Sequence, residues 1–421
     1  MKEKYISRMS IVVNSIIFIG VGITLTLLPT TSAKLFHFAV SLLVSLLGVI
    51  SFIFNGLKVK NKINILTSIS TFAMGMFLFS RQNTFLILFP VIFGFYMLLN
   101  GIIKLLAYMI YKEEKLKGYH PTLLSSIIDF IFSFIMITNP GENIRRLTII
   151  LGLYLILFGL TYIYDLIKDI YPNLFKTKTR NIRITLPIII SALIPYKIYT
   201  RINNILTKHI TPVHINKKKI SGKVDLEIFI HVKDSFSGRI GHADLCFGNT
   251  VYSYGCYDEE SKKLFETIGD GTLVKIKSKR KYLKFCTEHS KKIIFGFGLT
   301  LTDAQKERIK EELQQMMLFA YNWKCNQEID NTSTYNDYSS VLYRYTNAKY
   351  YKFSKGKWKK YFLFTTNCVK LVDKVLGATG SDILNVNGIV TPGAYYNYLN
   401  KEFKRKNSNV ISKTIYTNKK K

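Results

Sequence analysis

Residues 241–255, GHADLCFGNTVYSYG, and residues 362–377, FLFTTNCVKLVDKVLG, decide the fold of the second half of this chain. The first stretch alternates apolar and polar residues around a Gly-Asn turn, which predicts a β-hairpin with His242 on its first strand. The second stretch has apolar residues at helical spacing, so we expect an amphipathic helix that begins at Cys368 and ends at Gly377. Together the two stretches indicate a cysteine nucleophile with a histidine as its base.

The position of Cys368 at the start of a helix suits a nucleophile. Unpaired backbone N–H groups and the helix dipole favour negative charge there, so we expect the thiolate form to be favoured. The same N–H groups, with Asn367 or a neighbouring threonine hydroxyl, form a candidate oxyanion hole. His242 would act as general base or as the cation of a thiolate–imidazolium pair. The other four cysteines are expected to be small buried apolar residues: Cys246, Cys256, Cys286 and Cys325.

A third group usually orients the histidine of such a site, and the sequence leaves its identity open. If Gly248-Asn249 is a two-residue hairpin turn, Asp244 and Ser253 share a face with His242. A three-residue turn would bring Tyr254 to that face instead. The candidates for orienting His242 are therefore Asp244, Ser253 and Tyr254.

The surrounding segments predict an α+β domain. Expected strands cover residues 224–232, 242–248, 251–255 and 272–278, and expected helices cover residues 279–289, 303–320 and 394–403. Residues 322–350 form a polar stretch without a predicted element, and residues 381–392 read as a loop. His231 and His289 lie in no recognisable motif, so we expect them to be structural or exposed.

The His242 hairpin and the Asn367-Cys368 helix resemble the permuted NlpC-type papain-like families, which include lecithin:retinol acyltransferase and the YiiX-type bacterial hydrolases. Histidine before cysteine reverses the papain order. The resemblance covers residues 225–403 and implies a papain-like fold that hydrolyses or transfers acyl groups through a Cys acyl-enzyme. It favours Tyr254 as the orienting residue, because that residue usually lies about a dozen positions after the His. The usual His, Asn or Gln is absent.

The first half of the chain is strongly apolar. Its apolar runs each approach the roughly 20 residues that cross a bilayer, and they cover residues 11–28, 35–57, 63–79, 84–111, 121–138 and 147–167. Lys and Arg cluster before the first run and after the second, fourth and sixth. Positive loops tend to stay cytoplasmic, so we expect a membrane protein with both termini in the cytoplasm.

Residues 184–196, ITLPIIISALIPY, provide the main alternative for this topology. The run is short for a span and contains two prolines, which favours an interfacial or re-entrant segment at the inner leaflet. A seventh crossing there would place the second half outside the cell.

The membrane half contains an internal repeat. Residues 93–106, FGFYMLLNGIIKLL, and 151–164, LGLYLILFGLTYIY, share Gly-x-Tyr and a second Gly, and residues 47–56 are a looser copy. Three hairpins are therefore expected, in which glycines let helices approach closely. The pattern resembles the HdeD-type acid-resistance membrane proteins over about the first 170 residues. Asp129 is a carboxylate within a span, so it is either a functional group or a helix-tying hydrogen-bond partner.

Composition narrows the partners. The five cysteines lack CxxC spacing, which argues against a metal site, and no cofactor motif is present. The net charge of +32 is spread over loops and tail and indicates anionic lipid head groups rather than nucleic acid.

The predicted architecture is a multi-span α-helical membrane domain of six helices in repeated hairpins, followed by an α+β permuted papain-like domain. Its parts are residues 1–170, a basic linker at 171–220, the papain-like domain at 221–403 and a disordered basic tail at 404–421.

Three functions remain open. The first is a thiol-dependent hydrolase or acyltransferase that uses Cys368 and His242 at the membrane surface on a lipid, lipidated protein or peptide. The second is a membrane stress-response or transport protein whose papain-like domain only binds. The third, if the domain is external, is a cell-wall peptidase.

Overall fold

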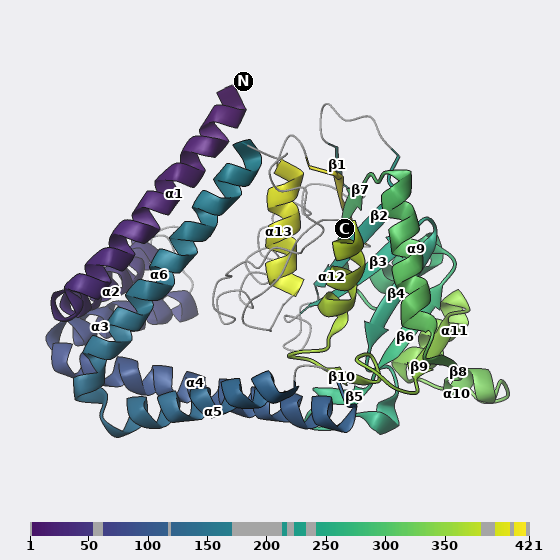
Figure 1. Cartoon of the computed structure of the whole chain (residues 1–421), viewed down its shortest axis with the longest axis horizontal. Helices are drawn as coiled ribbons and strands as arrows, with labels where there is room; N and C mark the ends of the chain where they lie inside the picture. Colours follow the sequence, from purple (N-terminus) through teal and green to yellow (C-terminus); the bar gives the residue numbers. More distant parts are fainter. Residues whose placement is uncertain are drawn as a thin grey trace. The chain divides into compact units, whose positions relative to one another are not determined.

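The computed structural model describes residues 2–53, 62–116, 119–170, 213–216, 223–232, 241–379, 392–404 and 408–417 of the 421-residue chain. It divides into two compact units: Met1–Tyr108 with Gly118–Lys176, and Met109–Lys117 with Thr177–Lys421. The predicted interfacial segment 184–196 lies outside the described residues, and so does the predicted loop at 381–392 except for Pro392, which begins a helix. Figure 1 labels the elements of both units.

The first unit is helical. Its elements are α1 (Lys2–Leu27), α2 (Pro29–Phe52), α3 (Lys62–Ser80), α4 (Gln82–Glu113, whose last residues fall in the second unit), α5 (Tyr119–Thr138) and α6 (Pro140–Ile170). Pro29 and Pro140 each open a helix, where the missing N–H of proline removes no intrahelical bond. Each helix overlaps one of the predicted apolar runs.

Three of these helices are long and apolar enough to cross a membrane, as judged by length and composition over the described residues: α2, α4 and α5. Shorter apolar stretches occur at Ser15–Leu27 in α1 and Ile65–Ser80 in α3. The chain therefore has the helices of a membrane protein, while six complete crossings remain a prediction.

Glycines set the spacing between helices in this unit, as predicted. A Cβ atom on Gly152 of α6 would lie 2.7 Å from the carbonyl oxygen of Gly22 on α1. A Cβ on Gly48 of α2 would lie 2.5 Å from the backbone nitrogen of Phe72 on α3. The prediction of close approach is confirmed.

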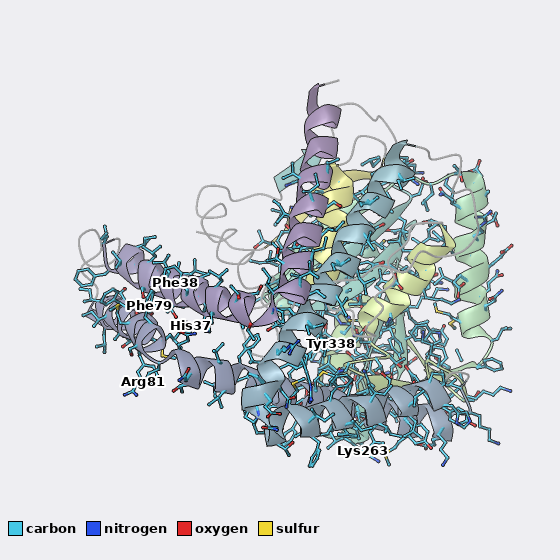
Figure 2. All side chains as sticks on the ribbon, turned by 60° about the vertical axis from the view of Figure 1, so that its left-hand side comes forward. His37, Phe38, Phe79, Arg81, Lys263 and Tyr338 are labelled. Carbon is cyan, nitrogen blue, oxygen red and sulfur yellow. The ribbon has the colours of Figure 1, made fainter. Side chains whose placement is uncertain are left out.

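The closest helix pairs differ from simple consecutive hairpins. The strongest contacts join α1 to α6 and α2 to α3. Figure 2 labels Phe38 on α2 beside Phe79 on α3, and their rings meet edge to face with centroids 5.1 Å apart. His37, one residue earlier, places Nε2 2.7 Å from the carbonyl oxygen of Leu78. Tight contacts thus join the second helix of one predicted hairpin to the first helix of the next.

The second unit contains, among its described residues, a nine-stranded antiparallel sheet in the order β1-β11-β7-β2-β3-β4-β6-β9-β8. Its strands are β1 (Val213–Asn216), β2 (Leu226–Val232), β3 (His242–Phe247), β4 (Thr250–Gly255), β6 (Thr272–Ile276), β7 (Ile293–Leu299), β8 (Ala320–Trp323), β9 (Lys349–Phe353) and β11 (Val410–Tyr416). A separate two-stranded sheet pairs β5 (Ile268–Asp270) with β10 (Lys360–Phe362).

Helices cover both faces of the large sheet (Figure 1). They are α8 (Lys279–Lys284), α9 (Asp303–Met317), α10 (Asn326–Ile329), α11 (Tyr338–Thr346), α12 (Cys368–Ala378) and α13 (Pro392–Lys404), and a π-helical turn, Phe285–His289, extends α8. Side chains alternate along a strand, so Ile228 and Ile230 pack with α9, α12 and α13 while Phe229 packs with α8 and α11.

The predicted strands at 224–232, 242–248, 251–255 and 272–278 and the predicted helices are all present. The α+β class is therefore correct at the level of a sheet covered by helices. Thr302 caps α9 through a capping box with Gln305, as its sequence position predicted.

Two predictions about the ends of this domain need correction. Residues 404–421 were expected to be a disordered tail, but β11 lies inside the sheet between β1 and β7. Val410, Ile411 and Ile415 are buried there. The linker prediction for 171–220 likewise missed β1, which pairs with β11. Both segments are rich in lysine and therefore resemble linker or tail sequence. The strands that they form pair with partners that are distant in sequence.

Candidate active site

The β3–β4 hairpin positions His242. Asp244 pairs with Ser253 and Phe247 pairs with Thr250, which leaves Gly248 and Asn249 as a two-residue turn. Gly248 adopts φ +62°, as the first central residue of a type II′ turn requires. The structure therefore adopts the two-residue alternative, which places Asp244 and Ser253 on the face of His242.

Helix α12 positions Cys368. Asn367 is its N-cap, and the Asn367 side chain accepts a hydrogen bond from the backbone N–H of Lys370 at 3.1 Å. Cys368 is the first helical residue and is 3% exposed. Behind it, the apolar face of the helix packs into the sheet core through Val369, Leu371, Val372, Val375 and Leu376.

Helix α12 packs against β3, which brings Cys368 close enough to His242 for its charge to raise the pKa of the His242 ring. Nε2 of His242 lies 2.8 Å from Oδ1 of Asp244 and 2.9 Å from the hydroxyl of Ser253. His242 is the first residue of β3, at the end of the strand, and its side chain is 24% exposed, so solvent reaches the pair.

Asp244 is the centre of a buried polar network. Its side chain is fully buried, and Oδ2 lies 2.7 Å from Nε2 of His231. The hydroxyl of Tyr282 donates a hydrogen bond to the same oxygen. Both histidine contacts are close approaches of a ring nitrogen to a carboxylate oxygen, and neither meets the geometry of a hydrogen bond among the described residues.

A second branch of the network leaves His242 through Ser253. The Ser253 hydroxyl lies 2.5 Å from the hydroxyl of Tyr257. Both side chains are buried. The ring nitrogen that faces Asp244 is thus also tied to a hydroxyl chain.

The charges of the network follow from these contacts. Burial alone would lower the pKa of His242, but the negative charges of Asp244 and Cys368 outweigh it and raise that pKa to about 10. For His231 burial prevails over Asp244, and its pKa falls to about 4. Burial opposes the ionised form of Asp244, but the two histidines hold its pKa well below the usual range. At neutral pH the cation beside Cys368 is therefore His242, while His231 is neutral.

The other predicted site residues have different partners. The hydroxyl of Tyr254 donates to the carbonyl oxygen of Trp358 at 3.0 Å. Burial raises the pKa of Tyr254 well above its usual value, with smaller contributions from Cys256 and Cys368, and Tyr254 belongs to the core on the α12 side of the sheet. The amide of Asn367 donates to the carbonyl oxygen of Leu363 at 2.8 Å, so both ends of that side chain hold the helix cap. The buried hydroxyl of Thr365 has no partner among the described residues.

Sequence reasoning missed His231 and Tyr282. His231 is the last-but-one residue of β2 and lies directly opposite His242 in the β2–β3 register, and Tyr282 comes from α8. The sequence offered a signal for His231 only: the alternation of residues 224–232 put it on the same face of the strand as Phe229 and Glu227.

The remaining cysteines lack comparable surroundings. All five thiols are free, and Cys246, Cys286 and Cys325 are buried while Cys256 is partly exposed. Burial raises the pKa values of Cys246 and Cys286 to about 12. Among the described residues, no group of three or more His, Cys, Asp or Glu side chains is placed to hold a metal ion.

The helical unit has its own buried carboxylate. Oδ2 of Asp129 on α5 lies 2.6 Å from Nζ of Lys104 on α4 and accepts a hydrogen bond from Asn100 at 2.6 Å. Lys104 also donates to the hydroxyl of Ser125 at 2.8 Å. These bonds tie α4 to α5, which favours the helix-tying interpretation of Asp129.

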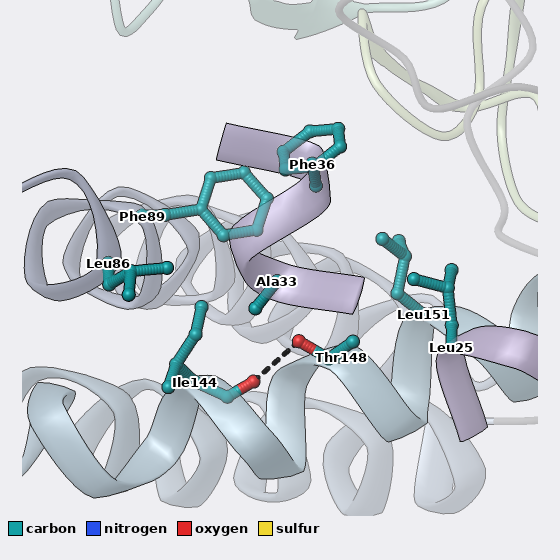
Figure 3. A pocket seen from close by; sticks show the side chains of 8 residues that line it. All are labelled: Leu25, Ala33, Phe36, Leu86, Phe89, Ile144, Thr148 and Leu151. Carbon is teal, nitrogen blue, oxygen red and sulfur yellow. Dashed lines mark hydrogen bonds between the residues drawn. The ribbon is translucent and has the colours of Figure 1, made fainter. Parts of the chain in front are cut away.

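A small pocket in the helical unit is almost entirely apolar (Figure 3). Its lining comprises Leu25, Ala33, Phe36, Leu86, Phe89, Ile144, Thr148 and Leu151. The Thr148 hydroxyl, its polar side-chain group, donates to the carbonyl oxygen of Ile144 at 2.7 Å. The pocket therefore offers no catalytic group.

Comparison with known families bears on the helical unit alone. A family model described as a short repeat of unknown function (DUF308) matches residues 66–138 and 124–175. No curated protein and no solved structure matches the chain. The family match supports a repeated membrane-type helical region, consistent with the HdeD-type resemblance. It does not cover the sheet domain, whose class has to be argued from its own geometry.

Proposed function

We propose that the sheet domain is a thiol-dependent hydrolase or acyltransferase of the permuted papain-like type, acting on an amide, ester or thioester bond. The observation that supports this proposal is the His242 ring, which lies close enough to Cys368 for the two charges to interact and has Nε2 2.8 Å from Oδ1 of Asp244. Nucleophile, base and orienting carboxylate are the three parts of an acyl-transfer site.

The chemistry follows from these positions. The Cys368 thiolate attacks the carbonyl carbon to form a thioester, and the His242 imidazolium gives its proton to the departing amine, alcohol or thiol. Neutral His242 then takes a proton from water or an acceptor, which attacks the thioester and releases Cys368. Asp244 keeps the ring oriented and stabilises its cationic form.

The oxyanion of the tetrahedral intermediate needs donors close to Cys368. The first backbone N–H groups of α12 are available for this role because Cys368 is at the helix start. The Thr365 hydroxyl, buried without a partner among the described residues, is the side-chain candidate. Asn367 is a poor candidate because its amide already bonds to Leu363.

We further propose that the substrate is a lipid, lipidated protein or peptide at the cytoplasmic membrane surface. The support is the long apolar helices that precede the domain and the positive charges of the loops between them. A C-terminal reporter fusion should report a cytoplasmic end. An external end would contradict this placement and favour cell-wall peptides as substrates.

Competitive alkylation of the cysteines tests the enzyme proposal directly. The full-length protein in detergent is treated briefly with iodoacetamide at pH 7, and each cysteine is quantified by mass spectrometry. Cys368 is 3% exposed whereas Cys256 is partly exposed, so accessibility alone predicts that Cys256 reacts first. An activated thiolate predicts the reverse order, with Cys368 at least about tenfold faster.

Two variants identify the group behind His242. Asp244→Asn should lower the alkylation rate of Cys368 by roughly 30-fold, because the amide cannot stabilise the imidazolium. Ser253→Ala removes the other contact of the same nitrogen and should change the rate by less than about threefold, since a neutral hydroxyl stabilises a cation weakly. Uniform alkylation of all cysteines in the unaltered protein would instead favour a domain that only binds.

A further inference from the structure

The candidate site contains two imidazoles for one carboxylate. His231 and His242 are directly opposite each other on β2 and β3, and their ring centroids are 5.7 Å apart. His231 reaches Oδ2 of Asp244 at 2.7 Å, whereas His242 reaches Oδ1 at 2.8 Å. Each histidine therefore has its own oxygen of the shared carboxylate.

The two histidines differ in their surroundings. His231 is 2% exposed, whereas the side chain of His242 is 24% exposed and contacts Cys368. Tyr282 donates to the oxygen that His231 contacts. One oxygen of Asp244 is thus held by two buried neutral groups, and the other is left to the histidine that contacts the thiol.

Other titratable groups around the network are neutral at pH 7 or lie beyond direct contact. Burial raises the pKa values of Tyr257, Tyr282, Tyr338 and Cys286 on the α8 and α11 side. Lys292, before β7, acts on His231 as a distant positive charge and opposes its protonation. At pH 7 the positive charge of the network is therefore on His242.

We propose that His231 is a positioning residue of the site: with Tyr282 it holds Oδ2 of Asp244, so that Oδ1 faces His242. This inference rests on the proposed thiol chemistry of Cys368. Without His231 the carboxylate would lose one of its two supports on that side and rotate away from His242. His231 itself touches neither the sulfur nor the substrate and acts through Asp244.

The test is the rate of Cys368 alkylation by iodoacetamide in the full-length protein between pH 6 and 11. His231→Phe keeps the ring volume but removes the nitrogen that contacts Asp244, and it should slow the reaction at pH 7 about tenfold. The step assigned to His242, near pH 10 in the unaltered protein, should move down by about one pH unit, because a displaced Asp244 stabilises the imidazolium less. His231→Gln restores a polar nitrogen that can contact Oδ2 of Asp244 and should recover the rate to within about threefold.

Matched variants separate this role from packing. His289→Gln changes an exposed histidine away from Asp244 and should leave rate and pH profile unchanged. If His231→Phe does not fold, Tyr282→Phe removes the other support of Oδ2 and should lower the pH step in the same direction.

Three outcomes would overturn the inference: an unchanged pH step in His231→Phe, an unchanged step in Tyr282→Phe, or His231→Gln as slow as His231→Phe. A slow Cys368 in the unaltered protein would instead contradict the proposed function itself.

Discussion

The helical unit and the sheet domain each bury a carboxylate, and they supply it with different partners. Asp129 contacts the amine of Lys104 and the amide of Asn100, both on the neighbouring helix α4. Asp244 contacts two histidines and a tyrosine, all of which can change protonation state. The partners of Asp129 tie two helices together, whereas the partners of Asp244 include two histidines that can redistribute charge. Burial of a carboxylate is therefore not by itself evidence of a catalytic site; the partners of the carboxylate have to be considered as well.

The largest expected effect comes from breaking the helical ion pair. Asp129→Leu leaves Lys104 without its counter-ion and should lower the free energy of unfolding by about 3 kcal/mol. Thermal unfolding of the full-length protein in detergent measures the change. The double variant Asp129→Leu with Lys104→Met should recover most of the loss, because it leaves no unpaired charge. Equal losses in the single and double variants would show that Asp129 does more than tie α4 to α5.

The glycine contacts of the helical unit should give a smaller effect. Gly152→Val places side-chain atoms against the backbone of Gly22 and should destabilise the protein by about 2 kcal/mol. Gly20→Val is the matched control, since a Cβ there meets nothing within 4 Å. Similar unfolding temperatures for the two variants would contradict close packing of α1 and α6.

The sheet domain should differ from the helical unit in its response to pH. His231 has a lowered pKa of about 4 against 6.5, so the stability it contributes is lost as the pH falls from about 6.5 to 4. His242 has a raised pKa of about 10, so its contribution is complete below about 6.5 and is lost as the pH rises to about 10. Asp244 contributes above its ordinary pKa of 3.8 and loses that contribution only at lower pH.

The network should therefore stabilise the domain most near pH 6.5. The unfolding temperature should fall on both sides by about 2–4 °C for each kcal/mol lost. Asp244→Asn should flatten the alkaline side of this profile, because the raised pKa of His242 depends on that carboxylate, and should keep the acid side, which comes from the burial of His231. Asp129→Leu should leave the shape of the profile unchanged. A profile that Asp244→Asn does not alter would show that the histidine charges are not coupled through that carboxylate.

Much of the architecture could be predicted because its signals are local. Apolar runs predicted helices α1 to α6, and the Gly-Asn turn with flanking alternation predicted the β3–β4 hairpin. Asn367 and Cys368 could be placed at a helix start because capping residues act within one turn. The strand β11 could not, since its lysines resemble a tail and its pairing with β7 joins residues more than a hundred positions apart.

The identity of the orienting group shows the same limit. Sequence spacing left Asp244, Ser253 and Tyr254 open, and the family resemblance favoured Tyr254. The register of the hairpin brings Asp244 and Ser253 to His242, while the Tyr254 hydroxyl bonds to Trp358. A turn longer by one residue would have brought Tyr254 to the face of His242 in place of Ser253, because successive side chains of a strand point to opposite faces.

By itself the sequence determined a helical membrane-type half, a helix-covered sheet and the candidacy of Cys368 and His242, since periodicity and capping are short-range properties. Only the tertiary structure decided which oxygen of Asp244 faces which histidine, and that His231 and Tyr282 join the network. These residues come from three separate elements. The protonation state of a buried group depends on the charged and polar groups that the fold brings within about 3 Å of it.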